Sequence, residues 1–289
     1  MNVSWKRRVR LAGVALVAGT QISVVSAGPY SEPQPLRTLA ADASTVAVAR
    51  VLDLGTRNGG HAAVHTIAIE RIVVGEWPAA PRVQVVEADD ASASTGFPPG
   101  RSEVLVLLRP LRGTPPARGQ KDAAFEVVGG RDGVLVLGDD TQRRDAIAAV
   151  ARARSASTPE EIRKHAFTDL VASHPRLVED GVVELAHLGG AIQYSQYERS
   201  VLTAVLADDS LPEQTRVILI EALGRGRDHS VAGVLAGAST ETPGLLGAAL
   251  HARAALGSPA PDTELATYIH SSNLGRRETA AEMATPRAR

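Results

Sequence analysis

The spacing of hydrophobic residues changes partway along this chain. Between residues 44 and 137, Val, Ile, Leu and Ala occur in short runs or alternate with polar residues, which is the pattern of β-strands. From Thr158 onward, apolar residues recur every three or four positions, which is the pattern of amphipathic helices. The sequence therefore predicts an α+β chain in two domains, with an all-β part before an all-helical part.

The first part contains a series of predicted strands with no long helix between them. Residues 82–87 alternate valine with polar side chains, as expected for a half-buried strand. The last two strands flank the glycine-rich residues 129–132, which favours a hairpin. Such strands predict a small all-β barrel or sandwich. The predicted strands are residues 45–54, 61–74, 82–87, 103–108, 125–128 and 133–137.

The second part carries a repeated helical unit. Thr158 offers a capping hydroxyl and Pro159 occupies the first helical position, and a second helix begins at Pro175. Residues 211–224 and 244–257 are apolar helical stretches that both end on Ala-Leu-Gly, 33 residues apart. A repeat of this length predicts an α-solenoid, here of about four helix pairs. The later predicted helices are residues 197–207, 211–224, 230–238, 243–256, 263–270 and 274–284, and residues 140–153 form a connecting helix.

Each part resembles a known family. The segment Leu-Pro-Glu-Gln-Thr-Arg-Val at residues 211–217, together with the Ala-Leu-Gly endings, resembles HEAT repeats and implies a protein-binding α-solenoid. The pair Ala41-Asp42 before a strand, the Val-Val-Gly turn that ends residues 67–75, and the strand at 101–108 after a Pro-Pro-Gly turn resemble an oligonucleotide/oligosaccharide-binding (OB) barrel of the netrin-like group. Tissue metalloproteinase inhibitors of that group act through an amino-terminal cysteine, which this chain lacks. That inhibitory activity is therefore not implied.

These patterns divide the chain into four segments. An export signal is expected over residues 1–27 and a β-barrel domain over 28–139. The connecting helix and a linker are expected over 140–157, and the HEAT-like domain over 158–289. The helical period begins at Thr158, so we place the boundary between the domains near Ser155.

The first 27 residues have the features of a signal peptide. Basic residues precede the apolar stretch 11–19, and Val25-Ser26-Ala27 offers a cleavage site before Gly28. An uncleaved membrane anchor and twin-arginine export through Arg7-Arg8 are the alternatives. We expect an exported protein, periplasmic or extracellular, that is not inserted in the membrane after signal cleavage.

Charge and cysteine content exclude several kinds of activity. Removal of residues 1–27 leaves 27 basic and 32 acidic residues, a net charge of −5, which argues against a nucleic-acid partner. The chain has no cysteine, which excludes disulfides, a lipoprotein anchor, a thiol nucleophile and thiolate metal sites. Aromatic residues make up only 3 % of the chain, so the core must be built from Ala, Val and Leu.

A few side chains are candidates for chemistry, and each has a simpler structural reading. His61 and His65 lie four apart on a strand and would reach one metal ion, but no third ligand is near them in the sequence. Residues 129–133 are glycine-rich but do not lead from a strand into a helix, and Ser195 lacks the frame of a nucleophile. We interpret the histidine pair as a solvated strand edge, residues 129–133 as a hairpin turn and Ser195 as part of a loop between repeats. Turn and helix-start roles explain the acidic doublets Asp89-Asp90, Asp139-Asp140 and Asp208-Asp209. No catalytic, cofactor-binding or metal site is expected.

Arginines and tyrosines of the helical part are candidates for partner contacts. Arg225, Arg227, Arg253, Arg276 and Arg277 would form a positive ridge if all were exposed, although ordinary solvated arginine is the simpler reading. The tyrosines of this part are anchors for a partner if they lie on the surface. They are Tyr194, Tyr197 and Tyr268.

Taken as a sequence, the chain is expected to be a non-enzymatic protein that binds another protein through a HEAT-like solenoid. The alternative is an inhibitor or ligand-binding module that acts through the N-terminal barrel. The two hypotheses differ in which part of the chain carries the binding surface.

Overall fold

The computed structural model describes residues 33–55, 64–78, 80–86, 96–111, 124–189, 192–238 and 240–284. The expected export signal at residues 1–27 lies outside these ranges. Within them, no helix combines the length and the apolar character that crossing a membrane requires.

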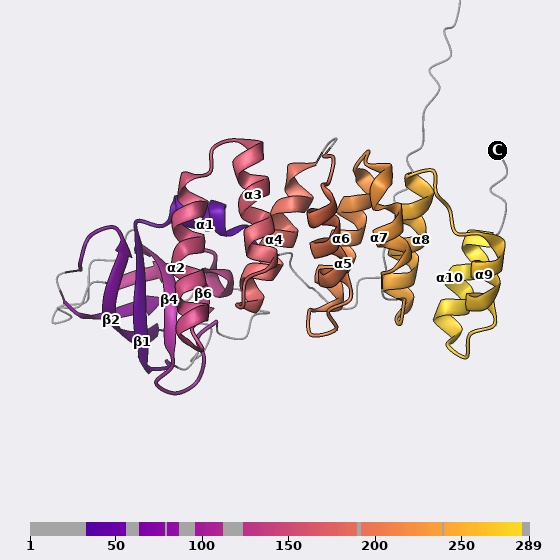
Figure 1. Cartoon of the computed structure of the whole chain (residues 1–289). Coiled ribbons are helices and arrows are strands. Elements are labelled where there is room, and N and C mark those ends of the chain that lie inside the picture. The colour runs from indigo at the N-terminus through magenta and orange to yellow at the C-terminus, as the bar shows by residue number, and fades with distance from the viewer. Residues whose placement is uncertain are drawn as a thin grey trace, which may run out of the picture. The chain divides into compact units, whose positions relative to one another are not determined.

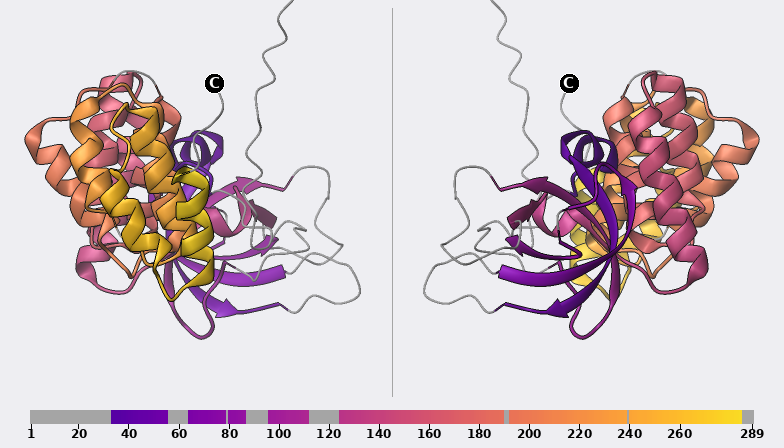
Figure 2. Two further views of the ribbon diagram at one scale, coloured as in Figure 1. Left: turned by 90° about the vertical axis from the view of Figure 1, so that its right-hand side faces the viewer. Right: turned by 90° about the vertical axis from the view of Figure 1, so that its left-hand side faces the viewer.

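The strands of the first part close into a barrel (Figure 1). Antiparallel pairs join β1 to β2, β2 to β3 and β5 to β4, and a parallel pair joins β3 to β5. An antiparallel pairing of β1 with β4 completes the ring. The right-hand view of Figure 2 shows these strands curling around a common interior. The strands are β1 (Thr45–Asp53), β2 (Val64–Val74), β3 (Arg82–Val86), β4 (Glu103–Pro110), β5 (Ala124–Val127) and β6 (Val134–Val136).

Strands β1 and β4 are buried on both faces, which explains their nearly continuous apolar sequences. One set of alternating residues, including Ala47 and Val106, lies in the barrel interior. The other set, including Val46 and Leu107, packs outside the barrel against helices α1 (Leu36–Asp42) and α2 (Asp140–Ser155). Sheet and helices therefore share a second core around these two strands.

The hairpin predicted around residues 129–132 is wrong. Strands β5 and β6 both pair antiparallel with β4, β5 near its end at Leu108 and β6 near its start at Val104. Between them Gly129 and Gly130 take positive φ angles of 72° and 55°, and a short 3₁₀ turn, η1 (Gly130–Gly133), bulges outward. After the turn, the chain continues in the same direction along β4. The turn therefore interrupts the pairing along one edge of β4 and does not reverse the chain.

Helix α1 was not expected from the sequence. Helix α2, expected as a connecting helix, also forms part of the outer core. Leu36, Leu39 and Ala40 of α1 are buried in the outer core. Ala146 and Val150 of α2 join the same core, as the helical prediction for this segment allows. Leu177, which belongs to the second helix of the helical part, packs there as well, so residues on both sides of Ser155 contribute to one core.

The helical part consists of helix pairs that stack in two rows. The members of each pair contact one another: α3 with α4, α5 with α6, α7 with α8 and α9 with α10. Helices α4, α6, α8 and α10, which follow one another in Figure 1, form the second row, and α3, α5 and α7 form the first row. The bounds are α3 (Pro159–Leu170), α4 (Pro175–Leu188), α5 (Gln196–Leu206), α6 (Glu213–Arg225), α7 (Ala232–Ala236) after the 3₁₀ turn η2 (His229–Val231), α8 (Pro243–Ala255), α9 (Asp262–Ile269) and α10 (Leu274–Ala284).

Helix starts in this part follow the sequence signals closely. The Thr158 hydroxyl accepts a hydrogen bond from the backbone N–H of Glu161, whose carboxylate accepts one from the backbone N–H of Thr158. Hydrogen bonds to the Glu161 carboxylate from the backbone N–H of Ser157, the backbone N–H of Thr158 and the hydroxyl of Ser157 lower its pKa to about 2. The predicted cap at Thr158 and proline at the first helical position are therefore confirmed.

The two Ala-Leu-Gly endings differ in structure although their letters agree. Gly224 is still helical, and an added Cβ would lie 2.6 Å from the Cβ and 2.7 Å from the Cα of Ala252 in α8. Gly257 follows α8, takes a φ of 70° and has open space around it. The first glycine lets two helices approach closely, and the second ends a helix in the left-handed conformation.

We expect Gly224→Ala to destabilise the protein by about 1–2 kcal/mol, although alanine is the better helix former. The new methyl group would overlap the backbone of Ala252 and force α6 and α8 apart. Gly233→Ala in α7 is the matched control, because nothing lies within 4 Å of its added Cβ, and it should stabilise by about 0.5–1 kcal/mol. Urea unfolding of both variants measures the difference; equal midpoints would show that α6 and α8 are not in close contact.

Candidate functional site

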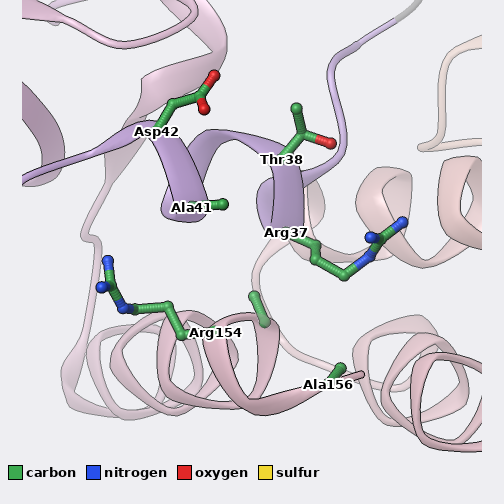
Figure 3. Close-up of a pocket in the computed structure, with 7 residues that line it drawn as sticks. Arg37, Thr38, Ala41, Asp42, Arg154 and Ala156 are labelled. Atoms are coloured by element: carbon green, nitrogen blue, oxygen red, sulfur yellow. The ribbon is translucent and has the colours of Figure 1, made fainter. Parts of the chain in front are cut away.

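A cleft of about 520 Å³ lies between α1 and the end of α2 (Figure 3). Its walls are mostly small or short side chains, and two arginines stand at its margins. Helix α1 contributes Arg37, Thr38, Ala41 and Asp42, and the other wall is formed by Ala153, Arg154 and Ala156.

Both arginines of the cleft are already used by the fold. Nη1 of Arg154 donates to the carbonyl oxygens of Ala40 at 2.7 Å and Ala43 at 3.3 Å, the last turn of α1. Arg37 points away from the cleft in Figure 3, and its Nε donates to Glu184 at 3.2 Å. The lining also includes one hydroxyl, of Thr38, and one carboxylate, of Asp42, both on α1.

Behind the cleft, buried charges connect four helices, and we call this group the barrel–helix joint. Each helix contributes: Arg37 from α1, Arg152 from α2, Asp169 from α3, and Arg176, Asp180 and Glu184 from α4. The three carboxylate residues are all buried. Within the joint, Arg152 bonds Asp169, Arg37 bonds Glu184, and Nη1 of Arg176 lies 3.9 Å from Asp180.

Burial dominates the electrostatics of the joint. Desolvation raises the pKa of Asp180 to about 7, against the lowering influence of Arg176 and of the hydrogen bond from the backbone N–H of Leu36. Desolvation also raises the pKa of Asp169 to about 6, although Arg152 favours its ionised form. Since Asp169 and Glu184 add negative charge near Asp180, the site resists a third ionised carboxylate.

A histidine adds a further tie between the barrel and α4. Burial lowers the pKa of His174, the N-cap of α4, so its ring is neutral at pH 7. Nδ1 accepts a hydrogen bond from the backbone N–H of Arg176, which leaves the proton on Nε2 to be donated to the carbonyl of Val136 at 2.9 Å. Strand β6 is thereby fixed to the start of α4.

Of the residues considered as a metal site or as the first acidic doublet, the structure describes only His65. The expectation of a solvated strand edge is wrong for His65, which is fully buried in β2 and contacts the ring of Phe97, with 4.9 Å between ring centroids. Its proposed partner His61 lies outside the described residues, as do Asp89 and Asp90. Over the described ranges, no group of three His, Cys, Asp or Glu side chains is placed to hold a metal ion.

The remaining doublets have the turn and helix-start roles expected for them, whereas Ser195, expected only as part of a loop, is the N-cap of a helix. Asp139 caps α2, and Asp208 accepts hydrogen bonds from Ser210 in a turn. Asp209 pairs with Arg216 at 2.7 Å. Ser195 caps α5 in a reciprocal pair with Glu198, so its hydroxyl is occupied by the backbone.

The arginine ridge is not formed as a continuous surface. Arg253 is buried and bonds Glu264 at 2.6 Å, and Arg276 lies over the ring of Tyr268. Among the tyrosines, Tyr194 is buried in the core, whereas Tyr197 is 66 % exposed at the start of α5.

Sequence reasoning missed the barrel–helix joint. One signal for it was present: Asp180 and Glu184 lie four residues apart in α4, on the side of the helix that carries the apolar Leu177. Charges on an apolar helix face indicate buried partners. The partners themselves, Leu36 and Arg37, come from α1, which the sequence analysis did not predict.

No protein-family model matches this chain, and no curated protein shows significant similarity to it. Its function must therefore be argued from the fold and from the chemistry of its surfaces.

Proposed function

We propose that the protein is an exported, non-enzymatic interaction protein whose helical part is a HEAT-like solenoid that binds another protein. The observation that carries this proposal is the stacking of helix pairs in two rows. Stacked pairs bury one face of each helix against neighbours and leave the outer faces available over many residues.

The first row offers the better binding face. Tyr197, the most exposed large apolar or aromatic side chain among the residues that the structure describes, lies at the start of α5. The exposed residues after it along α5 and α7 are small and uncharged, and they include Ser200, Thr203 and Ala236. A large aromatic ring beside short side chains suits a partner that packs closely, with the ring as the anchor.

Charged groups at and behind the cleft make contacts within the fold. The arginines of the cleft are held by carbonyls and by Glu184, and the carboxylates behind it face guanidinium groups. This arrangement is suited to joining helices.

The barrel is the alternative binding module. The ring order β1-β2-β3-β5-β4, with its parallel β3–β5 pair, agrees with an OB-type barrel of the netrin-like sort. Trp77, in the connection after β2, is 53 % exposed and is the barrel's counterpart of Tyr197. A ligand-binding or inhibitory barrel would use this side of the molecule, with the helices as a platform.

The two aromatic residues give a matched test in the full mature chain. Tyr197→Ala is expected to weaken binding of the partner, first identified by cross-linking in the native envelope, by at least about tenfold, the effect of losing an anchor worth more than 1.4 kcal/mol. Trp77→Ala should leave the affinity within about twofold. Titration calorimetry with the purified partner measures both. The reverse ranking would favour the barrel as the binding module.

A further inference from the structure

Two hydrogen bonds and an ion pair join the N-terminal end of helix α1 to α4, and the backbone N–H of Gln34 also donates to Asp132 of η1 at 2.8 Å. The backbone N–H of Leu36 donates to Oδ1 of Asp180 at 2.5 Å, and Nη2 of Arg176 donates to the carbonyl oxygen of Gln34 at 2.8 Å. Arg37 pairs with Glu184 beside them. Because the chain passes from α1 directly into β1, these contacts tie the barrel to the first helix pair.

For a buried carboxylate, Asp180 has few groups near it that would stabilise its negative charge. It is only 3 % exposed and lies among the apolar residues Leu36, Leu39 and Leu177 of the outer core. It accepts one short hydrogen bond from a backbone N–H, and the nearest guanidinium, that of Arg176, is 3.9 Å away. The charged and titratable groups around it are Arg37 of α1, Arg152 of α2, His165 and Asp169 of α3, and Arg176 and Glu184 of α4.

We propose that the contact of α1 with Asp180 is a pH-sensitive latch, which holds the barrel to the first helix pair at acidic pH and loosens as the pH rises toward neutrality. A protonated Asp180 still accepts the Leu36 hydrogen bond through its carbonyl oxygen and places no net charge in the apolar core. An ionised Asp180 adds a third negative charge beside Asp169 and Glu184. This inference concerns the joint and does not depend on the proposed function.

The direction of the effect follows from the proton balance. When α1 lifts away, water reaches Asp180 and its pKa returns toward the ordinary 3.8, from about 7 in the closed state. Between these two values the closed state holds a proton that the open state lacks. The stabilisation from this group is therefore complete below about pH 4 and lost by about pH 7, and opening becomes at most about tenfold more favourable per pH unit in that window.

Hydrogen–deuterium exchange of the full mature chain tests the latch. Protection factors, from which the intrinsic pH dependence of exchange has been divided out, are compared for peptides covering Leu36–Asp42 and, as a reference, β4. In the wild type we expect protection of α1 to fall at least about tenfold from pH 5 to 7.5 and then to level off, while that of β4 changes much less.

Two variants distinguish this latch from a general increase in the stability of the protein at low pH. Asp180→Asn keeps an acceptor for Leu36 but cannot ionise, so most of the pH dependence at α1 should disappear. Asp228→Asn is the matched control, because hydrogen bonds from Tyr194 and Ser230 lower the pKa of Asp228, and the wild-type profile should persist. A wild-type α1 whose protection stays within about twofold over this range overturns the proposal, whether or not the variants fold. An unchanged profile in Asp180→Asn overturns it as well.

Discussion

Leu223→Ala is expected to lower the free energy of unfolding by about 3–4 kcal/mol. Leu223 is 1 % exposed and belongs to the largest core cluster of the described residues, which runs from Ala166 to Leu256 through three successive helix pairs. Alanine has a helix propensity at least as high as that of leucine, so the loss arises from the cavity and from lost apolar contacts. Because stacked pairs stabilise their neighbours, hydrogen exchange should also quicken in α8.

Leu274→Ala provides the control for this prediction. Leu274 is also helical, at the start of α10, but it is 59 % exposed. Its replacement should change stability by less than about 1 kcal/mol. If chemical denaturation gave the two variants similar midpoints, Leu223 would not lie in a packed interface between helix pairs.

Arg152→Ala is expected to destabilise the protein by about 3 kcal/mol at pH 8, because it leaves the Asp169 carboxylate buried and unpaired. The loss should be smaller at pH 5, where Asp169, whose pKa is about 6 even beside Arg152, takes up a proton. Thermal unfolding at the two pH values measures this difference.

Arg225→Ala is the matched control for Arg152. Arg225 pairs with Glu221 on an exposed helix surface, with 3.9 Å between the charged atoms. Exposed pairs of this kind contribute about 0.3–0.5 kcal/mol, so this variant should unfold nearly as the wild type does at both pH values. An equal loss in the two arginine variants would mean that the joint is no more important than the surface.

The helical part could be predicted well because its signals are local. Thr158 and Pro159 mark a helix start by their own chemistry, and the period of apolar residues identifies each later helix without knowledge of its neighbours. Strands β1 and β4 were found for the same reason, since apolar runs of this length indicate burial on both faces.

The features that sequence reasoning missed depend on tertiary contacts. Helix α1 has seven residues, too few for a period to be distinguished, and its stability comes from the outer core and from α4. The turn at Gly129 has the composition of a hairpin, yet β4 offers its edge to both flanking strands. Likewise Gly224 and Gly257 end identical triplets, and only the position of Ala252 distinguishes their roles.

The contacts of the barrel–helix joint could not be predicted from the sequence for the same reason. Asp180 meets Leu36 across 144 positions of sequence, and Glu184 meets Arg37 across 147. Burial in this environment is the largest influence on the pKa of Asp180, ahead of Arg176, which lies four residues away in the sequence. A sequence can indicate that such charges need partners, but the fold selects the partners.

Site-specific photo-crosslinking in the native host tests most directly whether the helix rows carry the partner. A photoreactive amino acid is placed at exposed positions of the first row, Ser200 in α5 and Ala236 in α7, and at exposed barrel positions, Glu70 in β2 and Arg82 in β3. We expect the same partner protein to be captured from both helical positions and from neither barrel position. Capture confined to Glu70 and Arg82 would contradict the account and assign binding to the barrel.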